Sequence, residues 1–354
     1  MKILITGICG FVGSSLAKAW LEADSSLTVF GLDNLVRSGS ELNRGWLRRA
    51  GVHLFHGDIR LPSDFDVLPR VDWVIDAAAN ASVLAGVDGQ TSSRQVVEHN
   101  LIGTVNILEF CKKNEAGFVL LSTSRVYSLA TLASLSVKTV GDAFSLNTNQ
   151  SLPAGISSSG VSEACSVASP VSLYGSTKLA SEILALEYGE SFNIPVWINR
   201  CGVLSGAGQF GKPDQGIFSY WINAWMHRRP LTYIGFGGYG YQVRDCLHPR
   251  DLIPLLQKQT AGAAGPSRVV NIGGGIRNAM SLAQLSAWCA DRFGPHAVAR
   301  SLEERRFDVP WLVMDSGAAQ RVFGWERETV LAEILEDIAV HAEQNPNWLD
   351  ISSF

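Results

Sequence analysis

The sequence predicts an α/β protein built on a doubly wound parallel sheet, with a smaller mixed α/β lobe beside it. Apolar runs of strand length alternate with amphipathic stretches of helical period through the first half of the chain. A glycine triplet, Gly7, Gly10 and Gly13, lies between the first apolar run and the first helical stretch. This alternation is typical of parallel strands, because each parallel pair needs a long crossover that a helix usually supplies.

Each expected strand is a short apolar run, and each expected helix repeats apolar residues at spacings of three and four. The strands are expected at 2–6, 27–32, 53–56, 73–78, 118–122 and 195–200. The helices are expected at 11–22, 100–113 and 174–188. In a doubly wound sheet the carboxyl ends of such strands form the edge at which ligands bind.

The composition changes twice along the chain. Residues 128–170 are rich in Ser, Ala, Thr, Asn and Gly and have few charges, which predicts a long loop or flap inserted in the fold. Beyond residue 200 the chain is rich in Trp, Gly and Arg. We therefore expect a first domain over 1–200, insert included, and a smaller lobe over 201–354, with the chain crossing back around 241–272.

Charge and apolar content exclude several classes of protein. The chain has 29 Lys and Arg against 33 Asp and Glu, a net charge of −4, which disfavours nucleic acid as a partner. It has no uncharged apolar run of about 18 residues, so no membrane span is expected. The first ten residues have a strand pattern and lack the features of a signal peptide, which favours a cytoplasmic protein.

The cysteines form neither a C-x-x-C pair nor a cluster with histidine at zinc spacing. They are expected to be buried free thiols, with no metal site, at Cys9, Cys111, Cys165, Cys201, Cys246 and Cys289.

The glycine triplet indicates a dinucleotide-binding turn. Glycines here allow a tight turn and let the backbone approach a pyrophosphate at the helix N-terminus. A plain glycine-rich turn is the alternative, but Asp33 ends the next strand, where a carboxylate binds the ribose hydroxyls of NAD and repels the 2′-phosphate of NADP. Arg37 is either a ligand for that phosphate or a solvated side chain.

The spacing Tyr174-x-x-x-Lys178 places both side chains on one face of a helix. A nearby ammonium favours phenolate, so we expect the pKa of Tyr174 to be lowered and the residue to accept a proton. Taken alone, this pattern is a common accident. The run Ser122-Thr123-Ser124, at the end of an expected strand, adds hydroxyl groups that favour a catalytic centre.

With these motifs the sequence resembles the extended short-chain dehydrogenase/reductase superfamily of NAD-dependent nucleotide-sugar epimerases and dehydratases, over nearly the whole chain. The matching segments are the glycine turn, Asp33-Asn34-Leu35, Gly57-Asp58-Ile59, Ala77-Ala78-Ala79, Asn100-x-x-Gly103-Thr104, Ser122-Thr123-x-x-Val126-Tyr127 and Arg244-Asp245-x-x-His248. Within the superfamily it is most similar to the CDP-paratose 2-epimerases, also called CDP-tyvelose epimerases. That likeness is carried by the long insert, Gln209-Phe210, Asp214-Gln215-Gly216, Arg305-x-x-Asp308 and Asp315.

The resemblance implies a Rossmann domain that binds NAD, a lobe that binds a nucleotide diphosphate sugar, CDP-sugars being favoured, and a homodimer or tetramer. It implies catalysis by Tyr174, Lys178 and Thr123. The implied cofactor contacts are Gly7, Cys9, Gly10, Phe11, Val12, Gly13, Asp33, Asn34, Arg37, Asp58, Ile59, Ala77, Ala78, Ala79, Asn100, Ser122, Tyr174, Lys178 and Cys201. The implied substrate contacts are Ser124, Arg125, Gln209, Phe210, Gln215, Arg244 and Arg305.

Several alternatives stay open at this point. Sugar 4,6-dehydratases of the superfamily have an acidic pair after the catalytic threonine, and Ser124-Arg125 here argues against that reaction. Arg125 either faces substrate or is a packing cation, and Arg200 could be a buried structural cation. A helix with Phe218, Tyr220, Trp221 and Trp225 is expected to pack in a core rather than stack on a base. Other functions are a UDP-sugar 4-epimerase, an NAD(P)-linked keto-sugar reductase or a non-catalytic NAD-binding regulator.

Overall fold

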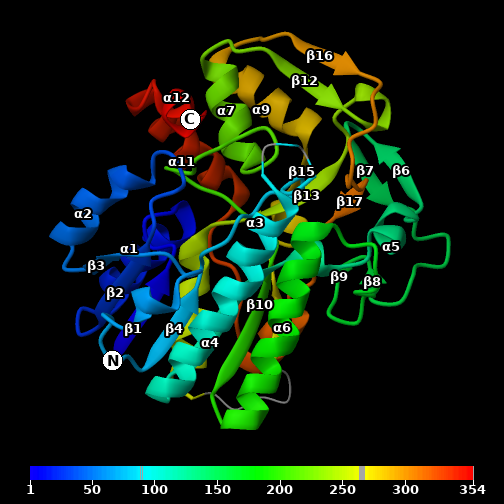
Figure 1. The fold of residues 1–354 in the computed structure, drawn as a ribbon. Helices are drawn as coiled ribbons and strands as arrows, with labels where there is room; N and C mark the ends of the chain where they lie inside the picture. Colours follow the sequence, from blue (N-terminus) through cyan, green and yellow to red (C-terminus); the bar gives the residue numbers. More distant parts are fainter. Residues whose placement is uncertain (88, 90, 263–267, 354) are drawn as a thin grey trace.

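The computed structural model describes residues 1–87, 89, 91–262 and 268–353 (Figure 1). Its centre is a seven-stranded parallel sheet, which confirms the predicted doubly wound fold. The strands, in spatial order, are β14 (Val269–Ile272), β10 (Val196–Cys201), β5 (Gly117–Thr123), β4 (Trp73–Asp76), β1 (Lys2–Thr6), β2 (Thr28–Asp33) and β3 (His53–His56). The strand order reverses between β1 and β4, which is where doubly wound sheets bind their ligands.

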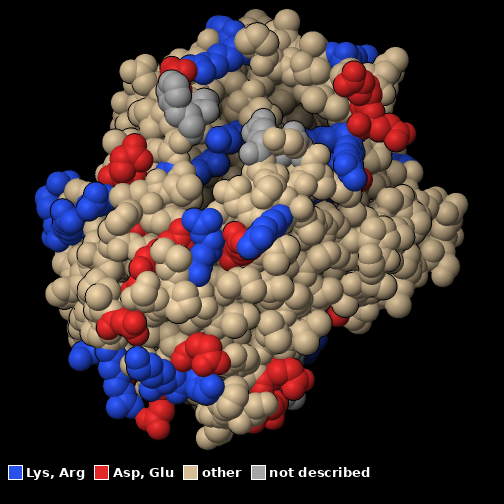
Figure 2. Space-filling view, viewed as in Figure 1, with Lys and Arg blue, Asp and Glu red and all other residues tan. Residues whose placement is uncertain are grey.

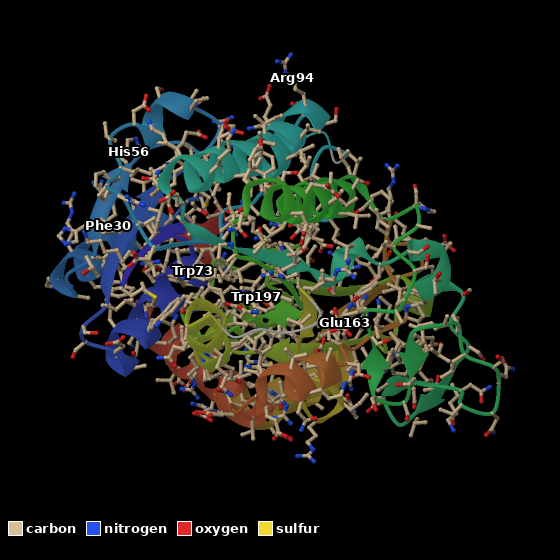
Figure 3. All side chains as sticks on the ribbon, turned by 90° about the horizontal axis from the view of Figure 1, so that it is seen from below. Phe30, His56, Trp73, Arg94, Glu163 and Trp197 are labelled. Atoms are coloured by element: carbon tan, nitrogen blue, oxygen red, sulfur yellow. The ribbon has the colours of Figure 1, made fainter. Side chains whose placement is uncertain are left out.

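Two apolar layers cover the sheet, because successive strand residues point to opposite faces. Ile3 and Ile5 of β1 pack with α1 (Phe11–Ala23), and Leu4 packs with α4 (Gly103–Asn114) on the other face. The first layer also holds α2 (Asn43–Arg49), α8 (Ile253–Thr260) and α10 (Gly317–Phe323), whereas the second also holds α6 (Leu173–Phe192). In Figure 3, Trp73 and Trp197 lie in the middle of the molecule, and Arg94 extends from its edge.

Three expected elements differ by two or more residues at one end. β4 stops at Asp76, two residues earlier than expected, and the buried Asp76 carboxylate accepts hydrogen bonds from Thr6 (2.7 Å) and Thr104 (3.1 Å). The helix expected from residue 100 is preceded by α3 (Ser93–Val97) and by a π-helical turn, η3 (Glu98–Ile102). α6 continues to Phe192, where Asn193 in the left-handed conformation ends it.

The insert at 128–170, expected as a long loop or flap, contains short regular elements, so it is not simply a loop. It contains α5 (Leu129–Ala133), the hairpin β6 (Val137–Val140) and β7 (Ala143–Leu146), and the short pair β8 (Ile156–Ser157) and β9 (Gly160–Val161). Its few apolar side chains, among them Leu132 and Leu146, pack around buried Tyr127 and Trp311. The Ser- and Ala-rich composition hid these elements, because they draw their core partners from elsewhere in the chain.

The remaining elements form a lobe at the carboxyl edge of the large sheet (Figure 1). Its strands are β11 (Val203–Leu204), β13 (Val243–Leu247), β15 (Ala279–Ser281) and β17 (Trp311–Leu312), with a separate pair β12 (Leu231–Ile234) and β16 (Val298–Ser301). Its helices are α7 (Ile217–Met226), α9 (Leu282–Phe293), α11 (Leu331–Gln344) and α12 (Trp348–Ser353). Phe218, Trp221 and Trp225 of α7 are buried in its core, as expected.

Short 3₁₀ turns connect these elements. They are η1 (Ser40–Leu42), η2 (Pro62–Phe65), η4 (Ser124–Val126), η5 (Phe236–Gly238), η6 (Pro249–Leu252) and η7 (Ile276–Asn278).

All six cysteines are buried and free, which confirms the prediction of buried free thiols. Within the described part of the chain, every helix is too short or too polar to cross a bilayer.

Candidate active site

The turn between β1 and α1 has room only for glycine at two of its positions. A Cβ on Gly13 would lie 2.3 Å from the Gly7 carbonyl oxygen, and a Cβ on Gly7 would lie 2.9 Å from the Ala78 Cα atom. Gly7 also has a φ of +63°, which side chains other than glycine rarely adopt. The backbone here therefore approaches the segment after β4 closely and leaves open space in front of the α1 N-terminus.

Asp33 ends β2 beside this turn. Its carboxylate accepts backbone N–H bonds from Cys9 and Leu35, both at 2.8 Å, which holds it at the sheet edge. Burial raises the pKa of Asp33, and these hydrogen bonds oppose that rise. Next to it, Asn34 donates to the Asp58 carboxylate (3.0 Å), which also forms an ion pair with Arg60 at 2.6 Å.

A groove of about 460 Å³ runs along this edge. Of the expected cofactor contacts, those lining it are Gly7, Gly10, Phe11, Val12, Gly13, Asp33, Asn34, Arg37, Ile59, Ala77, Ala78 and Ala79. The glycine cradle, the helix N-terminus and the Asp33 carboxylate fit an adenine dinucleotide.

The opposite wall of the groove comes from the segment that connects β11 to α7. Gln209, Phe210 and Gln215, expected as substrate contacts, line this groove instead. The Arg37 guanidinium donates to the Phe210 carbonyl oxygen and, at 3.3 Å, to the Gln215 side chain. Arg37 thus joins the two walls through these two hydrogen bonds.

Thr123 and Tyr174 meet at the carboxyl end of β5, and neither residue lines the groove. Thr123 is the last residue of β5, and its hydroxyl accepts the Arg125 backbone N–H at 3.2 Å. Tyr174 lies in the first turn of α6, whose N-terminus is capped by the Ser172 hydroxyl. The two side chains are hydrogen-bonded and are 9% and 7% exposed. A threonine and a tyrosine hydroxyl are therefore held together at the carboxyl end of β5.

The expected lowering of the Tyr174 pKa is wrong. Burial raises the pKa of Tyr174 to about 12, and the Thr123 hydrogen bond and the Arg125 charge only partly oppose this rise. Lys178 is itself 1% exposed, and burial lowers its pKa, although the carboxylates of Asp76 and Glu182 oppose that shift. The helical spacing correctly placed both residues on α6, but it could not reveal how deeply they are buried.

Buried polar side chains next to Thr123 and Tyr174 form hydrogen bonds and an ion pair that link β5, α6 and β10. Ser122, expected to contact cofactor, donates to Glu182 at 2.5 Å, and Glu182 forms an ion pair with Arg200 at 2.7 Å. Arg200 is thus a buried structural cation. Asn100 bonds both the N–H and the carbonyl of Asn80, at 2.8 and 3.0 Å. The sequence had not pointed to Glu182, since a lone glutamate on a helix is usually solvated.

Seven of the expected cofactor contacts do not line the groove: Cys9, Asp58, Asn100, Ser122, Tyr174, Lys178 and Cys201. Cys201, the last residue of β10, is paired in register with Thr123 of the neighbouring strand β5, and it is 5% exposed. Cys9 donates its backbone N–H to Asp33. Ser124 follows Thr123 in η4 and is buried.

A second cavity of about 160 Å³ lies between the sheet edge and the lobe, and Asp214 lines both cavities. Four arginines line it, and we call it the arginine pocket: Arg125, Arg244, Arg305 and Arg306. Three of them were expected as substrate contacts; Arg306 was missed. Arg244 forms an ion pair with Asp308 at 2.6 Å. Figure 2 shows Lys and Arg side chains on both sides of a hollow in the upper half of the molecule.

This fold and site define an α/β enzyme class that uses a dinucleotide cofactor. The chain belongs to the NAD dependent epimerase/dehydratase family, whose family model matches residues 3–273. The match confirms the resemblance seen in the sequence, the enzyme class and NAD as the cofactor.

The relatives include sugar-nucleotide epimerases of two kinds. CDP-paratose 2-epimerase from Salmonella typhi is 31% identical, over 92% of this chain and 94% of its own. UDP-glucuronate 4-epimerase from Thermodesulfobacterium geofontis is 25% identical, over 97% and 96%. Among solved structures, UDP-glucuronic acid 4-epimerase from Bacillus cereus, in complex with UDP-glucuronic acid and NAD, superposes with a TM-score of 0.74 at 25% identity and covers 97% of this chain and 99% of its own.

Proposed function

We propose that the protein epimerises a nucleotide diphosphate sugar by transient oxidation at one carbon, with no net redox change. The observation that carries the proposal is the Thr123–Tyr174 hydrogen bond, which lies next to Arg125 of the arginine pocket. The arginine pocket also shares Asp214 with the cofactor groove, which supports a site that holds both a cofactor and a polyanion.

Each residue of the centre has a separate task in this reaction. NAD, when bound, supplies a positively charged ring that takes a hydride from the sugar carbon and returns it. Tyr174 removes the proton of the sugar hydroxyl, and Thr123 donates a hydrogen bond to the same oxygen as negative charge develops there. Lys178, one helical turn from Tyr174, holds the cofactor ribose and adds positive charge near the phenolate.

The arginine pocket is suited to the diphosphate. Guanidinium groups form paired hydrogen bonds with phosphate oxygens, and the cavity brings them together from segments far apart in the chain. Elimination of water, as in 4,6-dehydratases, is disfavoured because Ser124 and Arg125 follow Thr123 where that reaction uses acidic residues.

Two substrate classes follow from the similarities. The 31% identity to CDP-paratose 2-epimerase supports a CDP-sugar inverted at C2, and we take this as the first candidate. The likeness to UDP-glucuronate 4-epimerases supports a UDP-sugar inverted at C4. A keto-sugar reductase would use the same centre, whereas a redox-sensing regulator would have no need of the Thr123–Tyr174 pair.

The experiment that tests the proposal is a panel of CDP-, UDP-, GDP- and dTDP-sugars, followed by proton NMR with no cofactor added. We expect inversion at one carbon of one substrate class and no accumulation of NADH. A reductase would consume cofactor in proportion to product, and a regulator would leave every sugar nucleotide unchanged. Either result would overturn the proposal.

We also propose a cytoplasmic dimer. The six free buried cysteines support a reducing compartment. α4 and α6 lie side by side on one face (Figure 1) and are joined by a 2.6 Å hydrogen bond from Tyr188 to Glu109. Ile183 and Phe192 of α6 are 55% and 46% exposed, which supports packing of this face against a second copy. Sedimentation equilibrium tests the dimer, and a monomer at micromolar concentration would contradict it.

A further inference from the structure

No residue of the insert at 128–170 lines the cofactor groove or the arginine pocket, although the structure describes the whole insert. The insert instead reaches the large sheet through Glu163 and Val161. The Glu163 carboxylate accepts the backbone N–H of Asn271 in β14 at 2.6 Å, and the Val161 carbonyl oxygen accepts the Asn271 side-chain amide at 2.8 Å. In Figure 3, Glu163 lies on the side of the insert that faces the middle of the molecule. Two groups of the insert therefore hold one buried asparagine of the sheet.

The Asn271 side chain also binds Tyr127, the residue just before the insert. Because the Asn271 Nδ2 donates to the insert, its Oδ1 is the atom that accepts the Tyr127 phenol, at 2.6 Å. The phenol oxygen in turn accepts a hydrogen bond from Arg200 at 3.4 Å, and the guanidinium lies over the Tyr127 ring, 5.2 Å from its centroid. All three side chains are buried, which strengthens these contacts.

Arg200 continues these hydrogen bonds to α6 and β5. Its guanidinium donates to both oxygens of Glu182, at 2.7 and 3.1 Å, and the same carboxylate accepts the Ser122 hydroxyl at 2.5 Å. Register pairing places Ser122, Arg200 and Asn271 at one level of the neighbouring strands β5, β10 and β14. We call the series the buried chain; its members are Asn271, Tyr127, Arg200, Glu182 and Ser122.

The buried chain ends next to the reaction centre. Ser122 precedes Thr123 in β5, and Glu182 lies on α6, which has Tyr174 in its first turn. The Ser122–Glu182 hydrogen bond therefore joins the strand of Thr123 to the helix of Tyr174, and Arg200 holds the Glu182 carboxylate in place. Groups that act on one reacting atom need accurate spacing, since a displacement of about 1 Å can lower turnover about 100-fold.

We propose that the insert positions the reaction centre through the buried chain. By holding Asn271 it fixes the position of α6 against β5, and with it the distance between the Thr123 and Tyr174 hydroxyls. The members of the buried chain are positioning residues, because none of them lines the groove or the arginine pocket. This inference rests on the proposed function, since it assumes that Thr123 and Tyr174 act on the substrate.

The contribution of the insert is tested with Glu163→Ala and Glu163→Gln, assayed on the sugar nucleotide of the panel that the native holoenzyme converts fastest. Alanine removes the acceptor of the Asn271 N–H, so we expect kcat to fall about tenfold while KM stays within about twofold. Glutamine keeps an acceptor oxygen at this position, so kcat should stay within about twofold of the native value.

Tyr127→Phe tests the middle of the buried chain, because it removes a single oxygen atom. It leaves the Asn271 Oδ1 without its donor, so kcat should again fall about tenfold at an unchanged KM. Tyr233→Phe is the matched control, because it removes a phenol that is bonded at the same 2.6 Å distance, to Ser286 in the lobe. It should leave kcat and KM unchanged.

The double variant Glu163→Ala/Tyr127→Phe should lower kcat little more than the stronger single variant does, because both changes break one chain. A correctly folded Tyr127→Phe with native kcat would overturn the inference, and so would losses that multiply in the double variant. Equal losses in Glu163→Ala and Glu163→Gln would overturn it as well, because the charge of Glu163 would then be responsible. Failure of the proposed function alone would appear differently. The native enzyme would convert no sugar nucleotide, while the decreases in melting temperature would still be non-additive in the double variant.

Discussion

The cofactor groove and the arginine pocket are built in different ways. The groove is lined mainly by residues 7–99, in which the Gly7 to Gly13 turn and Asp33 follow and end neighbouring strands, and it is completed by residues 209–215. The pocket takes Arg125 from η4, Arg244 from β13 and Arg305 from the segment after β16. A site made from consecutive elements can be recognised from spacing, whereas a site assembled from distant segments needs the fold.

The largest effect is expected where the two regions meet. Tyr174→Phe removes the proton acceptor while leaving the groove intact, so turnover should fall about 10²- to 10⁴-fold with the NAD content of the purified enzyme unchanged. Initial rates and the absorbance of the bound cofactor measure the two quantities. A variant that keeps most of its activity would show that another group takes the proton.

The pH dependence of the native enzyme should report the same residue. Because burial raises the pKa of Tyr174, most of the enzyme has a neutral phenol at neutral pH. Activity requires the phenolate, so the rate should rise with pH by up to about tenfold per unit. A rate profile that is flat above neutral pH would mean that Tyr174 is already deprotonated when the positively charged cofactor is bound.

The buried ion pair between Glu182 and Arg200 should stabilise the fold. Glu182→Gln removes one partner of a buried ion pair with Arg200, which should lower the free energy of unfolding by about 3–5 kcal/mol. Glu187→Gln on the exposed side of the same helix is the control and should change it by less than about 0.5 kcal/mol. Denaturant titration measures the free energy of unfolding of both variants. Equal decreases would contradict a stabilising role of the ion pair.

Gly13→Ala tests the glycine turn that lines the cofactor groove. The added Cβ would lie 2.3 Å from the Gly7 carbonyl oxygen, so α1 must shift, at a cost of about 1–3 kcal/mol. We expect a lower melting temperature and loss of NAD on dialysis. Gly45→Ala in α2 is the control, since its Cβ would meet only the far end of Arg49 at 3.5 Å. Retention of NAD by Gly13→Ala would contradict the assigned turn.

The smallest expected effect is a change in cofactor preference. Asp33→Asn keeps the size of the side chain but removes its charge, so affinity for NAD should fall about tenfold and affinity for NADP should change less. Fluorescence titration of the apoenzyme with both cofactors measures the ratio. A larger loss of affinity for NADP than for NAD would assign Arg37 to the 2′-phosphate despite its hydrogen bonds to Phe210 and Gln215.

Much of the first half of the fold could be predicted from the sequence, because its strands and helices are local patterns. The hairpins of the insert could not, since their apolar residues are few and pack against Trp311 far along the chain. Nor could the Arg244–Asp308 pair, whose partners are 64 residues apart, although the sequence marked both. The predicted direction of the Tyr174 pKa shift was also wrong, because the burial of a side chain depends on the whole fold.

The central claim is that a hydrogen leaves one sugar carbon and returns to that carbon without exchanging with water. It is tested most directly by running the epimerisation in deuterium oxide and examining the product by proton NMR. The account predicts inversion at one carbon that keeps its original hydrogen, because the hydrogen moves as a hydride within the closed site. Deuterium at the inverted carbon would mean that the carbon had been deprotonated, and it would contradict the account.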